Sequence, residues 1–269
     1  MKPKTIPAKN PIKIESLFLK SFRLAKSNLN KTGLMIFFDL MFIVSVIALY
    51  RLSLFFAQSI AVPATLPSAI VFIALSLVYY LIISFVYSFF KYSVLGFIKS
   101  LFDETEFSFK RIGQFYSLNI VIAGIFFAVM VLANFLLASI KAQYRPFVFI
   151  FLAVPYLLFL YVIVNTSHSL FYQGFSIKDA IRKGFKITFR EIKIYRETIL
   201  IMILFALLLW LLFFGGGYVV RLVGSKNFSL YLNAYAYFKQ ITIIVFDAVF
   251  YLVILINRIS FYALIRENK

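Results

Sequence analysis

Reactive side chains are scarce in this 269-residue chain. It contains no cysteine, one histidine and 10 acidic residues, against 28 lysines and arginines. The absence of cysteine excludes thiol catalysis, disulfide bonds and thiolate metal sites. The only imidazole, His168, has no carboxylate close in sequence to orient it, and its polar neighbours in NTSHS fit a hydrated helix end. We therefore expect no catalytic residue, no cofactor and no metal site, and we expect that the protein is not an enzyme.

The acidic residues and glycines also lack a recognisable binding motif. The densest acidic group is Asp103, Glu104 and Glu106, which fits a hydrated turn better than a metal site. The run Gly215–Gly217 has no lysine partner of the kind found in phosphate-binding loops. It either ends an apolar stretch or interrupts a helix beside a substrate site, as glycines do in some transporters.

Apolar and aromatic side chains are abundant instead. Hydrophobic residues make up 63% of the chain and aromatic residues 20%, and the mean hydropathy is +0.95. A helix that crosses a hydrocarbon core of about 30 Å needs about 20 apolar residues. Six stretches qualify: 33–58, 66–92, 113–138, 146–169, 198–217 and 240–263. The predicted fold class is all-α, a polytopic membrane helix bundle with six transmembrane helices, of which the first is too long for a cleaved signal.

The basic residues divide unequally between the two sides of such a bundle. One side has 8 in the first 33 residues, 4 in 91–111, 7 in 178–196 and 3 at the C-terminal end, and the other side has 6. Since cytoplasmic loops are enriched in lysine and arginine, both termini are predicted to be cytoplasmic, in a cell membrane. The net charge of +18 does not indicate nucleic-acid binding, because the basic residues form no separate soluble domain.

The segment SIKDAIRKGFKITFREIKIYRETIL (176–200) contains seven of the basic residues. In a helix, its apolar side chains fall on one face: Ile177, Ile181, Phe185, Ile192 and Tyr195. The predicted lipid-surface residues lie largely opposite: Lys178, Arg182, Lys183, Lys186, Arg190 and Lys193. Ser176 and Asp179 fit a capping box, while Gly184 weakens the helix by about 1 kcal/mol. We expect a basic amphipathic helix that lies along the interface and attracts anionic lipid, although topology alone also explains these charges.

Similar basic segments precede the other pairs of spans. Residues 14–29 have the same amphipathic pattern, and we expect a third such helix between the second and third spans. An Ile-Lys pair precedes each pair of spans, as Ile12-Lys13, Ile98-Lys99 and Ile177-Lys178. Each is followed about ten residues later by a phenylalanine with a basic neighbour. The chain is therefore predicted to be a single membrane domain over 1–269, with a three-fold internal repeat of units 12–91, 92–175 and 176–263.

The run GFSIKDAI (174–181), which leads into a basic helix before the fifth span, resembles a known group of proteins. With the six-span layout, it is similar to six-span prokaryotic membrane proteins that include the membrane domain of some glycerophosphodiester phosphodiesterases. The resemblance implies an integral membrane protein of a prokaryote. It transfers no catalytic residue, because nothing in the chain matches a soluble phosphodiesterase domain.

Two acidic and two basic residues lie inside predicted spans. Asp39 and Arg51 belong to the first span, and Asp247 and Arg258 to the sixth. A charge at mid-bilayer costs about 2.5–3.5 kcal/mol, so each should have a partner or water. Opposed residues of antiparallel helices have a constant sum of residue numbers, and 39 with 258 gives 297 while 51 with 247 gives 298. We predict the ion pairs Asp39–Arg258 and Arg51–Asp247 between adjacent first and sixth spans.

The favoured function is a non-enzymatic membrane scaffold or accessory protein. Its basic cytoplasmic face would engage anionic membrane lipids or a protein partner. The alternative is a small-solute or ion transporter that uses Asp39, Asp247 and a helix break at Gly215–Gly217. A membrane-embedded lipid enzyme ranks third, because the sequence offers no cluster of catalytic groups.

Overall fold

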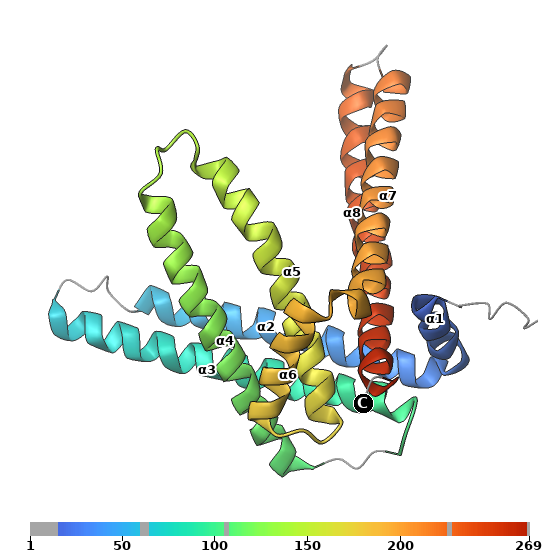
Figure 1. Ribbon diagram of the computed structural model, residues 1–269. Helices are drawn as coiled ribbons and strands as arrows, with labels where there is room; N and C mark the ends of the chain where they lie inside the picture. Colours follow the sequence, from blue (N-terminus) through green and yellow to red (C-terminus); the bar gives the residue numbers. More distant parts are fainter. Residues whose placement is uncertain (1–15, 60–64, 105–107, 225–227, 268–269) are drawn as a thin grey trace, which may run out of the picture. The chain divides into compact units, whose positions relative to one another are not determined.

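The computed structural model describes residues 16–59, 65–104, 108–224 and 228–267, and the regular structure within them is entirely α-helical (Figure 1). In chain order the helices are α1 (Leu17–Ser27), α2 (Leu29–Ser59), α3 (Leu66–Ser100), α4 (Phe109–Ala138), α5 (Arg145–Tyr172), α6 (Ile177–Arg190), α7 (Ile192–Gly224) and α8 (Phe228–Glu267). Six of them, all but α1 and α6, are long and apolar enough to cross a membrane. The predicted all-α fold class with six spans is confirmed, and the chain is a multi-pass membrane protein.

The long helices extend past the predicted spans. α3 has 35 residues and α8 has 40. At 1.5 Å per residue, 35 residues extend about 50 Å, which exceeds a hydrocarbon core of about 30 Å.

The C-terminal extension of α3 replaces one predicted element. Residues 91–100 continue α3 instead of forming a separate amphipathic helix, so the prediction of a third interfacial helix is wrong. The physical reason is that Val94, Leu95 and Ile98 carry the buried face of α3 onward without an intervening proline. α1 and α6 are the separate short helices of the described residues.

The chain divides into two compact units. We call residues 1–24 and 197–260 the α7–α8 unit, and residues 25–196 and 261–269 the central unit. The single membrane domain and the repeat units 12–91, 92–175 and 176–263 stay predictions.

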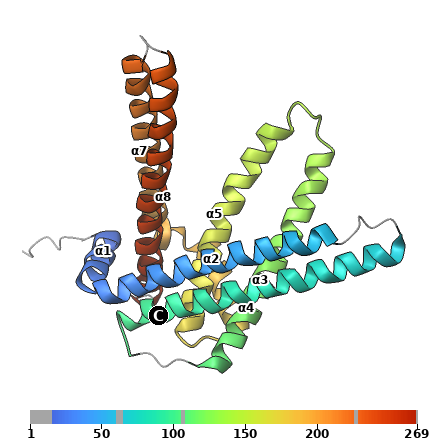
Figure 2. The same ribbon diagram turned by 180° about the vertical axis from the view of Figure 1, so that it is seen from behind.

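In the α7–α8 unit, α7 and α8 lie side by side along most of their length (Figures 1 and 2). Near one end, Phe18 of α1 packs with Val253 and Ile256 of α8. The ring of Phe18 also lies 6.1 Å, between centroids, from that of Phe205 in α7. Large apolar side chains therefore join the three helical segments of this unit.

α7 is continuous through its three glycines. It runs from Ile192 to Gly224, so the prediction that Gly215–Gly217 end or interrupt this span is wrong. A Cβ atom on Gly216 would lie 2.9 Å from two ring carbons of Phe238 in α8. The same ring stacks on Phe213 of α7, with centroids 5.7 Å apart. Gly216 thus permits the close approach of two helices, as small residues do in membrane bundles.

In the central unit, burial concentrates at one end of the helices. α2 and α3 form a hairpin (Figure 2), α3 also packs on α4 and α5, and α6 packs on α4 and α5. We call the shared end, where the buried residues of α3, α4 and α5 gather, the packed end; it comprises 88–98, 112–126 and 162–172. The opposite ends of α4 and α5 are mostly exposed, and we call them the outer ends.

Candidate functional site

α6 begins with the predicted cap but is shorter than the predicted amphipathic helix. The Oγ atom of Ser176 accepts a hydrogen bond from the backbone N–H of Asp179, at 3.2 Å, which confirms the serine half of the predicted capping box. The Asp179 carboxylate accepts from the Ser176 hydroxyl at 2.7 Å. The helix ends at Arg190, and Ile192 already starts α7. The apolar side chains of Ile192 and Tyr195 therefore belong to another helix, and that part of the predicted face is wrong.

α6 is anchored to protein by a stripe of small residues. Ala180, Gly184 and Thr188 are buried, while Ile181 and Phe185 are half-buried. A Cβ atom on Gly184 would lie 2.3 Å from the Oγ atom of Ser167 in α5. The glycine thus has a packing role that offsets its low helix propensity.

The predicted lipid-surface residues are all exposed: Lys178, Arg182, Lys183, Lys186, Arg190 and Lys193. The Nζ atom of Lys186 lies 3.7 Å from a carboxylate oxygen of Glu191, and the ammonium of Lys183 lies 3.9 Å from the ring centroid of Phe175. Glu191 offsets only one of these six charges. A role of this basic face in lipid binding stays a prediction.

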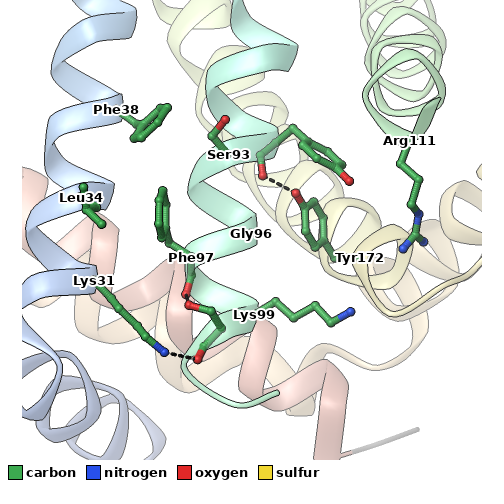
Figure 3. Close-up of a pocket in the computed structure, with 11 residues that line it drawn as sticks. Lys31, Leu34, Phe38, Ser93, Gly96, Phe97, Lys99, Arg111 and Tyr172 are labelled. Atoms are coloured by element: carbon green, nitrogen blue, oxygen red, sulfur yellow. Dashed lines mark hydrogen bonds between the residues drawn. The ribbon is translucent and has the colours of Figure 1, made fainter. Parts of the chain in front are cut away.

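A second cationic site lies at the packed end. It is a pocket of about 460 Å³ between α2, α3, α4 and α5 (Figure 3). The lining residues are Lys31, Leu34, Phe38, Tyr92, Ser93, Gly96, Phe97, Lys99, Ser100, Arg111 and Tyr172. Three of them are cationic and none is acidic, so we call this the cationic pocket.

Two of the three cations are held by backbone carbonyls. The Nζ atom of Lys31 donates to the carbonyl of Ser100 at 2.5 Å, at the C-terminal end of α3. An Nη2 group of Arg111 donates to the carbonyl of Phe171 at 3.2 Å, and its guanidinium carbon lies 5.5 Å from the Phe171 ring centroid. Because carbonyls are neutral, these bonds orient the cations and leave their charge uncompensated.

The walls of the cationic pocket are aromatic. The hydroxyl of Tyr172 donates to the carbonyl of Tyr92, and their rings lie 4.8 Å apart between centroids. On the α2 side, the rings of Phe38 and Phe97 lie 5.5 Å apart. Gly96 separates these two walls, and a Cβ atom there would lie 3.5 Å from the Tyr172 hydroxyl.

A buried polar chain supports this end of the unit. The Nε2 atom of His168 lies 2.6 Å from the Oδ1 atom of Asn119, whose Nδ2 group donates to the Oγ atom of Ser88 at 2.9 Å. These bonds join α5, α4 and α3. His168 is fully buried, so the prediction of a hydrated helix end is wrong. Sequence reasoning also missed Asn119 and Ser88, because single polar residues in apolar helices do not reveal their partners.

The predicted acidic turn lies at the rim of the same unit. A carboxylate oxygen of Asp103 accepts from an Nη2 group of Arg266 at 2.8 Å, and Glu104 is exposed. Glu106 lies outside the described residues. No three acidic or histidine side chains within 16–59, 65–104, 108–224 and 228–267 are grouped closely enough to hold a metal ion.

The four intramembrane charges belong to two units. Asp39 and Arg51 lie on α2 in the central unit, and Asp247 and Arg258 lie on α8 in the α7–α8 unit. Asp39 and Arg258 are half-buried, whereas Arg51 and Asp247 are exposed within their own units. The ion pairs Asp39–Arg258 and Arg51–Asp247 stay predictions.

Comparison with protein families, with curated proteins and with solved structures found no match. The resemblance to six-span prokaryotic membrane proteins stays a prediction.

Proposed function

We propose that this chain is a non-enzymatic scaffold or accessory protein of a prokaryotic cytoplasmic membrane, which engages anionic lipid headgroups through a basic cytoplasmic face. The observation that supports it is the set of six exposed cations from Lys178 to Lys193. Five of them lie on α6, which packs on α5 with Gly184 against Ser167, and Lys193 lies in the first turn of α7. Each basic residue near an anionic leaflet contributes about 1 kcal/mol of attraction. Because the helix is fixed to the bundle, that attraction acts on a rigid surface, which also suits a protein partner.

Neutralisation of three basic residues on one side of α6 tests this proposal. Arg182, Lys186 and Arg190 are spaced four residues apart, so their side chains project from one side of the helix. The Arg182→Gln, Lys186→Gln, Arg190→Gln triple variant should retain less anionic phospholipid than the parent in native mass spectrometry after gentle solubilisation. We expect the loss of lipid affinity to correspond to about 1 kcal/mol for each neutralised residue.

The matched control removes three exposed charges that the sequence assigns to the opposite side of the membrane. It is the Lys141→Gln, Arg221→Gln, Lys239→Gln triple variant, and it should retain lipid as the parent does. Equal retention by all three proteins would mean that the α6 cations only set topology.

The transporter alternative has one observation in its favour. Asp247 lines a pocket of about 160 Å³ in the α7–α8 unit, together with the polar Thr242 and apolar residues that include Trp210 and Phe213. A carboxylate in such a place is a candidate coupling group for protons or cations. Proton flux into proteoliposomes that is lost on Asp247→Asn would favour transport over the scaffold.

A further inference from the structure

We infer that the cationic pocket binds the phosphate of a phosphomonoester lipid, whose hydrocarbon chain lies against the α2 side of the pocket. This inference names the ligand class of the lipid-binding function proposed above and rests on that function. It concerns residues of α2 to α5, which are separate from the exposed cations of α6.

The positive charge of the pocket favours the binding of an anion. Lys31, Lys99 and Arg111 line it without an acidic residue, and the described residues provide none of the three with an ion-pair partner within 4.0 Å. Lys99 also lines a neighbouring pocket with Asp103 and Glu104, of which Asp103 is paired with Arg266. Arg111 also lies in the first turn of α4, where the helix dipole disfavours a cation. A bound anion would neutralise the cluster of positive charge and offset the unfavourable interaction of Arg111 with the helix dipole.

The number of available donors fits a phosphate. A lysine ammonium has three N–H donors and an arginine guanidinium has five. Lys31 and Arg111 each donate one bond to a carbonyl, and among the described residues no acceptor is bonded to the Lys99 ammonium. Figure 3 shows the ends of the Lys99 and Arg111 side chains approaching the same space beside Tyr172. A phosphomonoester, with about −1.5 to −2 charges at pH 7, matches several cations better than a singly charged phosphodiester does.

The order of side chains along α2 fits an amphiphile. Lys31 lies at the start of the helix, and Leu34 and Phe38 follow deeper in the span. Seven residues correspond to about 10 Å, so charge at the membrane surface gives way to apolar side chains toward the hydrocarbon core. A phospholipid has the same order of headgroup and chain. The pocket volume of about 460 Å³ suits the headgroup and the first part of a chain.

Gly96 provides the passage between the two parts of the pocket. It lies on α3 between Phe97, on the apolar side, and Tyr172, on the cationic side (Figure 3). An added Cβ atom would meet only the Tyr172 hydroxyl, at the ordinary contact distance of 3.5 Å, so a larger side chain at this position would extend into the pocket. Gly96→Leu therefore tests whether the ligand spans both parts.

The experiment measures the binding of phosphatidic acid, phosphatidylglycerol and soluble glycerol 3-phosphate to the purified full-length protein by native mass spectrometry. The parent should bind one phosphatidic acid about tenfold more tightly than phosphatidylglycerol. Lys99→Gln, which breaks no described side-chain hydrogen bond, should weaken phosphatidic acid binding about tenfold, and Gly96→Leu by a similar factor. The matched control is Lys110→Gln, an exposed neighbour of Arg111 outside the pocket, which should bind as the parent does.

Three results would overturn the inference. The first is equal affinity of the parent for the two lipids. The second is an equal loss in the Lys99→Gln and Lys110→Gln variants. The third is glycerol 3-phosphate binding as tight as that of the lipid and insensitive to Gly96→Leu, which would indicate a soluble ligand. The α6 triple variant separates the two proposals, because it should lose general anionic lipid and keep the single tight phosphatidic acid.

Discussion

The two ends of α5 differ in which side chains are buried: the packed end buries polar as well as apolar residues, and the outer end exposes large apolar ones. At the packed end, the polar run from Asn165 to Ser169 is at most 6% exposed. At the outer end of the same helix, Phe147 and Phe151 are 73% and 77% exposed. In a water-soluble protein, the apolar residues would be the buried ones.

This difference follows from the solvent. Lipid tails solvate an apolar side chain about as well as a protein interior does, so burial brings phenylalanine little gain. Polar groups must instead find partners inside the protein, as His168, Asn119 and Ser88 do. The packed end is therefore where single substitutions should have large effects, and the outer end is where the same substitutions should have small ones.

Removal of a packed ring should give the largest effect. The ring of Phe115 lies 4.6 Å from that of His168 and 5.7 Å from that of Tyr92, between centroids, and is fully buried. Phe115→Ala should lower the free energy of unfolding by about 3–5 kcal/mol because it leaves a cavity. Phe151→Ala, at the exposed outer end, should change it little. Thermal unfolding in one detergent compares the two, and similar losses would contradict the difference between the ends.

Overpacking at a close helix contact should come next. Gly184→Leu places a side chain where Ser167 of α5 already lies and should destabilise the protein by about 1–3 kcal/mol. The matched control is Gly124→Leu in α4, where no heavy atom lies within 4 Å of the added Cβ. The control should keep or slightly raise the melting temperature, since leucine has the higher helix propensity. If both variants are tolerated, the α5–α6 contact is looser than its geometry implies.

Two asparagines of α4 provide a polar test of the same difference. Asn119→Ala leaves His168 and Ser88 without their shared partner, and we expect a loss of about 1–2 kcal/mol. Asn134 is exposed toward the outer end, and Asn134→Ala should be nearly neutral. Chemical-denaturant unfolding of both variants in one detergent measures the contrast. A loss for Asn119→Ala as small as that for Asn134→Ala would show that the polar chain is dispensable.

The sequence predicted the spans well because a long apolar run in a bilayer must be helical. Backbone groups in a bilayer need internal partners, so each long apolar run must be helical. The same reasoning located the cap at Ser176 and placed the cations of α6 on the exposed side. It did not predict that α6 packs on α5 and α4, because the buried residues of this helix, Ala180, Gly184 and Thr188, are small and carry almost no hydropathy signal.

The cationic pocket had no comparable signal. Lys31, Lys99, Arg111 and Tyr172 come from four helices, and their approach depends on how these helices cross. In the sequence, the three cations were indistinguishable from topology charges. Similarly, Gly215–Gly217 suggested a helix break because their contact with Phe238 of α8 is visible only in three dimensions.

A surface ion pair just beyond the packed part of α3 should give the smallest effect. The side chains of Asp103 and Arg266 are 41% and 46% exposed, with 2.8 Å between the bonded atoms. Water and salt screen such a pair, so Asp103→Asn should cost only about 0.2–1 kcal/mol of unfolding free energy, and less at high ionic strength. Glu104→Gln, an exposed neighbour without a described ion pair, controls for the change in net charge. If Asp103→Asn proved as damaging as Asn119→Ala, charge at the rim rather than buried polar packing would stabilise this end. Melting temperatures of both variants at low and high salt decide between these two sources of stability.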